Sequence, residues 1–337
     1  MIVVTVYIEK GNQDCDQVIA DLADLQENYP HKLAVVDIDQ DPDIKSNYQG
    51  IVPVVAVGVY KLHHPFTRQD LQVALGAAQD RAAQLDKIGD EKYEARIERG
   101  RTVSGADRFS YWLTGRYLLI VNVLMLLYAG LPFLAPVLAK AGADLPANVI
   151  YTIYKPFCHQ LSFRSFFLFG EQAFYPRQLA GVSGVGTYEQ FFGDSTLNLA
   201  SARAFTGIGE IGAGVGRIGY KVALCERDVA IYGSLFLFGV VFALTRRKIK
   251  PLPWYWWVAI GIIPIGIDGA SQLPSLLNIF PQWMLIREST PVLRVLTGAL
   301  FGIATAWYLF PLIEESMRET RKLLAGKMAV VAQIQQS

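Results

Sequence analysis

Four stretches of this chain are too apolar and too poor in charge to form the surface of a soluble protein. They cover residues 117–139, 228–245, 254–267 and 292–313. About 20 consecutive apolar residues cross a bilayer as a helix. Only 18% of the chain is charged, against about a quarter in soluble proteins. We therefore expect an all-α integral membrane domain of about four helices over 117–313.

Basic residues at the ends of these stretches set the expected orientation. Lys and Arg cluster before the first stretch, between the second and third, and after the fourth. Cytoplasmic flanks are enriched in such residues. We therefore predict a multi-pass protein of the cell membrane with both termini in the cytoplasm. A charged linker with an interfacial helix (81–116) should join the N-terminal domain (1–80) to the membrane part, and a cytoplasmic helix (314–337) should end the chain. The net charge of +1 argues against nucleic-acid binding.

This topology leaves residues 140–227 as one long segment on the outer side. Within it, residues 148–170 are apolar but contain Lys155, His159 and Arg164. Charged side chains are costly at lipid-exposed positions. We expect this stretch to lie at the membrane interface or to pack among the other helices rather than to cross.

The first 80 residues have a different pattern, with short β-branched runs alternating with amphipathic helices. The order β-α-β-α-β-β-α resembles the thioredoxin fold of small glutaredoxin-like domains. The resemblance places Cys15 at a helix N-terminus and Pro53 at the start of a strand facing it, and makes them the redox candidates. The family motif is C-x-x-C, but Asn12 stands at its first position. One thiol cannot close an intramolecular disulfide, so we expect a redox-inactive module that docks a protein partner; a monothiol role is the alternative.

Polar residues gather at one end of the predicted membrane helices. Such residues are costly in a membrane and mark functional positions by default. They act either as structural ion pairs between helices or as parts of an ion or substrate path. The six residues are Arg164, Arg227, Asp268, Gln272, Arg287 and Arg294.

The same region resembles the membrane-protein family known as domain of unknown function 2085. The shared motifs are C-H-Q (158–160), R-S-F (164–166), C-x-R (225–227) with I-Y (231–232), D-G-x-x-Q (268–272), R-x-S (287–289) and L-R-x-x-T-G (293–298). The family continues C-x-R with a second cysteine, where this chain has Asp228. The resemblance implies a small multispan domain and supplies no activity.

Two cysteines of the membrane part belong to these motifs. Cys158, His159, Cys225 and Asp228 offer sulfur, nitrogen, sulfur and oxygen ligands, which suit zinc. A disulfide between Cys158 and Cys225 on the oxidising side, or two thiols that only pack, are the alternatives.

Three classes of function follow from these patterns. The first is a membrane protein with an outer-face metal or thiol site and a cytoplasmic thioredoxin-like module. The second is a non-catalytic accessory or assembly protein of the membrane. The third is a small transporter, which the lack of an evident internal repeat disfavours.

Overall fold

The protein is described as a computed structural model, which covers residues 2–88, 100, 102–192, 202, 207–208, 217–273 and 287–336. The chain divides into two compact units. The first contains residues 1–116 and 315–337, and the second contains residues 117–314. Most of the charged part of the predicted linker, residues 89–99, lies outside the described residues.

The first unit is built on a four-stranded mixed sheet of order β2-β1-β3-β4. β1 and β2 are parallel, while β3 is antiparallel to both β1 and β4. The strands are β1 (Ile2–Ile8), β2 (His31–Asp37), β3 (Val54–Val57) and β4 (Tyr60–His63). The helices are α1 (Gln13–Leu25), the short 3-10 turn η1 (Ile38–Gln40), α2 (Pro42–Tyr48) and α3 (Arg68–Ile88). The predicted thioredoxin-like α/β fold is confirmed.

Two hydrophobic clusters hold this sheet between helices. One contains Val4 and Val55 of the sheet together with Leu22 of α1 and Leu75 of α3. The other contains Ile44 of α2 and, from the far end of the sequence, Ala325. α1 and α3 therefore pack on one face of the sheet, and α2 packs on the other beside the C-terminal helix.

The C-terminal helix is an integral part of the first unit. Its residues belong to α13 (Pro291–Gln336), a single helix of 46 residues that begins in the second unit. Arg321 forms an ion pair with Asp43, and Lys327 forms one with Asp107 at 2.8 Å. The ammonium group of Lys32 donates to the carbonyl oxygen of Ile334 at 2.7 Å. The segment predicted as a cytoplasmic C-terminal helix (314–337) is thus helical and packs within the first unit.

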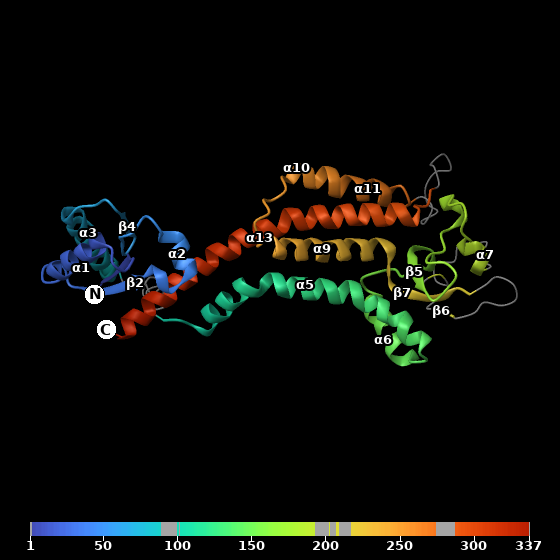
Figure 1. The fold of residues 1–337 in the computed structure, drawn as a ribbon, viewed down its shortest axis with the longest axis horizontal. Helices are drawn as coiled ribbons and strands as arrows, with labels where there is room; N and C mark the ends of the chain where they lie inside the picture. The colour runs from blue at the N-terminus through green and yellow to red at the C-terminus, as the bar shows by residue number, and fades with distance from the viewer. Residues whose placement is uncertain are drawn as a thin grey trace. The chain divides into compact units, whose positions relative to one another are not determined.

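Helices that run side by side make up most of the second unit (Figure 1). They are α5 (Gly105–Lys140), α9 (Glu226–Leu244), the succession α10 (Trp254–Trp256), η4 (Trp257–Ile262) and α11 (Ile263–Ala270), and the first part of α13. Large apolar side chains remain exposed along them, including Leu126, Leu237 and Ile303. Such a surface suits contact with lipid.

Three helices of the described chain are long and apolar enough to cross a membrane: α5, α9 and α13. About four were predicted. The predicted stretch 254–267 is helical from 254 to 270 but is interrupted by the π-helical turn η4, just before Pro264. Proline has no N–H to donate and crowds the preceding turn, which explains the local change in hydrogen bonding.

Small residues allow the helices to approach one another closely. A Cβ atom on Gly302 of α13 would lie 2.1 Å from the hydroxyl oxygen of Ser234 on α9. A Cβ atom on Gly298 would lie 2.7 Å from the carbonyl oxygen of Arg227. Trp257 of η4 donates to the hydroxyl of Thr305 on α13 at 3.1 Å. Membrane helices associate through this kind of close packing because no hydrophobic driving force acts between them in lipid.

A small sheet and short helices occupy one end of this bundle (Figure 1). The sheet has the order β5-β7-β6, all antiparallel. Its strands are β5 (Ser165–Leu168), β6 (Gly207–Ile208) and β7 (Gly219–Cys225). The helical pieces are α6 (Asp144–Tyr154), η2 (Ser162–Arg164), η3 (Gln178–Ala180) and α7 (Tyr188–Phe192). The sequence did not predict this sheet. Residues 148–170 form the end of α6, a loop and β5, and not a helix that crosses.

Candidate functional site

Cys158, Cys225 and Asp228 meet at the end of the bundle that carries the small sheet. One ligand atom of each, the two sulfurs and a carboxylate oxygen, lie within 4.8 Å of one another. The two cysteines are 67 positions apart in the sequence and come from different elements. Two thiols and a carboxylate at this spacing can hold a metal ion, and two sulfurs this close can also be joined in a disulfide.

Local structure explains how each of the three residues reaches the cluster. Cys158 follows α6, and its backbone N–H donates to the carbonyl of Tyr154 at 3.0 Å in the turn after the helix. Cys225 ends β7 and is the N-cap of α9. Asp228 lies three residues later in the first turn of α9, so its side chain shares a face with Cys225. A carboxylate in a first helical turn also interacts favourably with the helix dipole.

The two thiols are not equivalent. The thiol of Cys225 donates a hydrogen bond to the sulfur of Cys158, which lowers the pKa of Cys158, and the backbone N–H of Gln160 also donates to that sulfur at 3.4 Å. The same bond to Cys158, together with burial, raises the pKa of Cys225 well above its ordinary value. Cys158 is therefore the thiol that ionises first, and the thiolate is the form that binds metals and attacks disulfides.

A buried lysine supports the loop that carries Cys158. The ammonium group of Lys221 on β7 is fully buried and donates to the carbonyl oxygen of Gln160 at 2.6 Å. Burial lowers the pKa of Lys221 to about 7, and the charge of Cys158 opposes this shift. The Gln160 side chain donates to the carbonyls of Tyr151 (2.9 Å) and Ala223 (3.0 Å). These bonds hold the Cys158 loop against both α6 and β7.

His159, the fourth predicted ligand, does not join the other three. Its side chain is exposed, whereas Cys158 before it is buried. Among the described residues the ligand group consists of Cys158, Cys225 and Asp228 alone. Adjacent side chains point in different directions on an ordinary backbone, which accounts for the separation.

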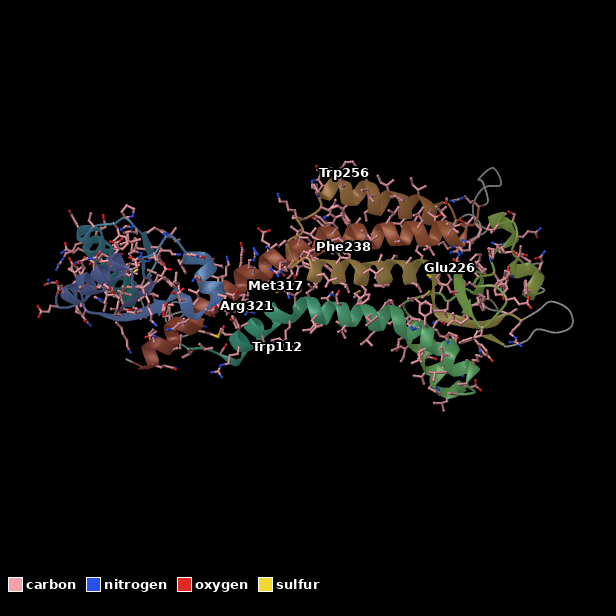
Figure 2. All side chains as sticks on the ribbon, in the orientation of Figure 1. Trp112, Glu226, Phe238, Trp256, Met317 and Arg321 are labelled. Carbon is pink, nitrogen blue, oxygen red and sulfur yellow. The ribbon has the colours of Figure 1, made fainter. Side chains whose placement is uncertain are left out.

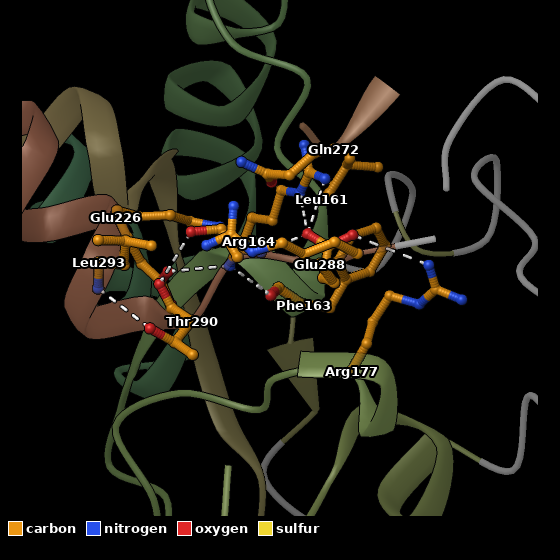
Figure 3. Close-up of polar contacts among 12 residues, drawn as sticks. Leu161, Phe163, Arg164, Arg177, Glu226, Gln272, Glu288, Thr290 and Leu293 are labelled. Atoms are coloured by element: carbon orange, nitrogen blue, oxygen red, sulfur yellow. Dashed lines mark hydrogen bonds and ion pairs between the residues drawn. The ribbon is translucent and has the colours of Figure 1, made fainter. Parts of the chain in front are cut away.

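Beside this cluster lies a buried network of arginines around Glu288, shown in Figure 3. Glu288 is fully buried in its side chain and pairs with Arg164 at 2.7 Å, with Arg177 at 3.8 Å, and with Arg294. Arg294 also pairs with Glu226 at 3.2 Å and donates to the carbonyl of Phe163 at 3.1 Å. Each buried charge therefore has an opposite charge beside it, as burial requires.

A second network centres on Asp268 of α11. Its buried carboxylate pairs with Arg227 and, at 3.5 Å, with Arg287. It also accepts hydrogen bonds from the hydroxyl of Ser289 at 3.1 Å and the side-chain amide of Gln272 at 3.4 Å. This network joins α9, α11 and the residues that precede α13. The six predicted polar residues are thus divided between the two networks.

The first turn of α9 contributes to all three clusters. Cys225 and Asp228 belong to the thiol–carboxylate group, Glu226 pairs with Arg294, and Arg227 pairs with Asp268. Figure 2 shows Glu226 at the sheet end of the bundle, with Trp256 at the opposite end. The networks therefore fix the position and rotation of the helix turn that presents the thiol site.

Cys15 and Pro53, the redox candidates of the first unit, are both buried. Cys15 is fully buried, in the same hydrophobic cluster as Val52 and Ala325. Burial raises the pKa of Cys15, and the charges of Asp14 and Asp16 reinforce the shift. Pro53 is buried after a cis peptide bond. Asn12 caps α1, where its side-chain oxygen accepts from the N–H of Asp14 at 3.0 Å.

Several residues of the site were not among those predicted from the sequence. Lys221 is the clearest, because it is the only charged residue in the apolar strand 219–225. A lone charge in a buried strand indicates a specific partner, so the sequence could have indicated Lys221 as part of the site. Tyr151 gave no such signal, because a tyrosine is ordinary in an apolar helix. Glu288 lies within the R-x-S motif (287–289) but was not among the six predicted polar residues.

Comparisons with known proteins agree with both halves of the architecture. Residues 4–76 match the family model described as Glutaredoxin-like domain (DUF836). Residues 217–308 match the model described as Predicted membrane protein (DUF2085), a range that includes Cys225 and Asp228 but not Cys158. An uncharacterized protein of Methanocaldococcus jannaschii is 24% identical over 206 residues, which is 59% of this chain and 94% of the relative. The two resemblances seen in the sequence are confirmed: a glutaredoxin-like domain is joined to a membrane-protein domain.

Proposed function

We propose that the membrane unit binds a zinc ion on Cys158, Cys225 and Asp228. The observation that supports this proposal is the approach of two sulfurs and a carboxylate oxygen to within 4.8 Å. Ligand atoms of a tetrahedral zinc ion lie roughly 3.5–4 Å apart, so only a small closing movement is needed. The lowered pKa of Cys158 favours the same chemistry, because zinc binds the thiolate.

Three protein ligands leave the fourth position of a tetrahedral ion for water or a substrate. This number is typical of zinc sites that act on a bound molecule, whereas purely structural sites use four protein ligands. The ionic networks on either side of the site hold α9 in place and supply the fixed geometry that such a centre requires.

A second candidate is a thiol–disulfide couple of Cys158 and Cys225. The hydrogen bond between the thiols, with one pKa lowered and the other raised, favours it. Oxidation would join the two sulfurs and release two electrons and two protons to a disulfide of another molecule. The same experiment separates the two candidates.

The test is zinc analysis and thiol counting on the full-length protein purified in detergent with zinc supplied. We expect about one zinc ion per chain, and three reactive thiols after denaturation with a chelator, because the chain has three cysteines. Cys158→Ser and Asp228→Asn should lose or strongly weaken zinc binding. Cys15→Ser is the matched control, since Cys15 belongs to the other unit, and it should keep the metal.

Two results would contradict the zinc proposal. A single reactive thiol in the denatured protein without metal would identify the disulfide. Three reactive thiols without metal under zinc-replete conditions would leave two thiols that only pack. His159→Gln should keep the zinc, because His159 lies outside the ligand group.

We further propose that α10, η4 and α11 form a fourth crossing, with both chain termini in the cytoplasm and the thiol site near the outer face. The basic residues at 246–250 and 318–322 support this orientation. Exposed single cysteines introduced at Lys248 and Arg318 should resist an impermeant thiol reagent in intact cells. A cysteine at Ser183 should react. Labelling at Lys248 with protection at Ser183 would contradict this topology.

The first unit, which we propose is the soluble unit of the protein, is proposed to act as a docking module without dithiol chemistry. Support comes from the single buried cysteine, its raised pKa and the asparagine at the first motif position. The full-length protein should fail to reduce a disulfide substrate in an insulin-type assay. Sustained reduction that depends on Cys15 would contradict this proposal.

A further inference from the structure

Helix α6 carries apolar side chains on two opposite faces. Ala147, Ile150, Tyr151 and Tyr154 are buried. They pack in one hydrophobic cluster with Ala135 of α5 and Leu224 of β7. These contacts attach the inner face of α6 to the bundle, but they do not account for the apolar side chains on its other face.

The outer face of α6 is an exposed apolar stripe. Leu145, Val149 and Ile153 recur every four residues with 78%, 49% and 53% of their surface exposed, and Phe157 continues the row at 65%. No charged residue occurs between Asp144 and Lys155. An open hollow of about 590 Å³ lies on this face, lined by Leu145, Val149 and Ile153 together with Asp144, Asn148 and Thr152. A stripe of this kind normally marks a partner or a membrane.

The stripe continues the exposed apolar surface of α5. α5 ends at Lys140, and its last turns expose Leu134 and Val137 by 44% and 43%. Only residues 141–143 separate α5 from α6, in a turn that contains Gly142 at a φ of 77°. Figure 1 shows α6 leaving the end of α5 at an angle instead of extending it. With 11 residues, α6 is too short to cross a bilayer.

Residues typical of a membrane interface flank the stripe. The ammonium group of Lys140 lies 4.0 Å from the ring centroid of Phe169, which is itself 39% exposed. Lys155 follows the helix at its other end. Aromatic rings and lysines with long apolar stems prefer the depth of the lipid headgroups.

We propose that α6 is an interfacial helix that lies in the headgroup layer and inserts Leu145, Val149, Ile153 and Phe157 among the lipid acyl chains. Interfacial helices bind bilayers with an apolar face just below the headgroups; in α6 the opposite face packs against the protein instead of facing water. Cys158 comes directly after Phe157, so this position of α6 also places the thiol site at headgroup depth. The proposal does not depend on whether the site binds zinc.

The test measures what surrounds a nitroxide spin label on the stripe. The full-length protein carrying Val149→Cys is labelled and reconstituted into vesicles of phosphatidylcholine and phosphatidylglycerol. Power saturation then compares collisions with oxygen, which concentrates in lipid, and with a nickel chelate, which stays in water. Ser183→Cys, at an exposed loop position, is the matched control, and the labelled parent chain corrects for the native cysteines.

We expect the oxygen-to-nickel collision ratio at Val149 to exceed that at Ser183 severalfold. Ile153→Cys, one turn further along the stripe, should give the same result. Equal ratios at Val149 and Ser183 would show that the stripe faces water and would overturn the proposal. Exclusion of both reagents at Val149 and Ile153 would show a protein partner, such as a second copy of the chain, and would overturn it as well.

Discussion

The C-terminal part of α13 should stabilise the soluble unit, and Ala325→Glu tests this directly. Ala325 is 3% exposed and belongs to the hydrophobic cluster on the α2 face of the sheet. The larger side chain would overfill this cluster at a cost of about 1–3 kcal/mol. Burial of its polar end without a partner would cost about 1–3 kcal/mol more. The expected loss of about 2–6 kcal/mol is a large part of the stability of a typical domain.

Leu323→Glu is the matched control for this substitution. Leu323 lies two residues away on the same helix and is 76% exposed, so the same new side chain would point to solvent. A surface change of this kind alters stability by about 0.5 kcal/mol or less. Any effect of added charge on the helix itself is common to both variants.

The assay is native-state hydrogen exchange, followed by mass spectrometry, of the full-length protein in detergent. The amides of β1 and β3 exchange through opening of the soluble unit. In Ala325→Glu they should exchange at least roughly 30-fold faster than in the parent, since about 1.4 kcal/mol corresponds to a factor of ten. They should be unchanged in Leu323→Glu. Equal rates in the two variants would refute the view that this helix is part of the soluble core.

Three further predictions concern other parts of the chain. Glu288→Gln removes a buried carboxylate shared by three arginines, so thermal unfolding should show a loss of stability of the membrane unit of about 3–5 kcal/mol. Glu189→Gln, which changes a more exposed ion pair, should have little effect. Because burial lowers the pKa of Lys221 from an ordinary 10.5 to about 7, the unfolded chain binds more protons between these values. Stability should therefore rise with pH across this window, by up to about 1.4 kcal/mol per pH unit, and Lys221→Met should flatten the rise. Asn12→Cys should permit a disulfide with Cys15 in oxidised glutathione, detected by mass spectrometry after alkylation, at a cost of about 1 kcal/mol for the lost helix cap; absence of that disulfide would contradict the thioredoxin-like geometry.

Local patterns in the sequence predicted most of the elements. The run 228–245 corresponds to α9 (Glu226–Leu244), and the alternating runs and helices of the first 80 residues correspond to the elements from β1 to α3. The stretch 292–313 corresponds to only part of α13, because that helix continues without a break through the segment predicted as a cytoplasmic helix (314–337). Hydrophobic periodicity reports the conformation of a segment but not its distant partner. For this reason the packing of Ala325 against the soluble sheet could not be predicted.

The candidate site, like the fold, could be predicted from the sequence only in part. The sequence indicated Cys158, Cys225 and Asp228 because cysteines and charges are rare in this part of the chain. It did not indicate that His159 would point away or that Lys221 would support the loop, because both depend on the fold of the small sheet. That sheet was missed because two of its strands, β5 and β6, have only four and two residues, and because the pairing of β5 with β7 is irregular between Ser165 and Phe167.

The first turn of α9 limits how this protein can change in evolution. Consecutive residues of an α-helix are rotated by about 100°, so Cys225, Glu226, Arg227 and Asp228 point to three different sets of partners. A single insertion or deletion within this turn would move every one of these side chains to the wrong partner at once. A substitution at one of these positions changes a single set of contacts and leaves the others in place. A change in the number of residues would disturb all of these contacts together. The spacing within 225–228 should therefore be more constant among relatives than the identity of its residues.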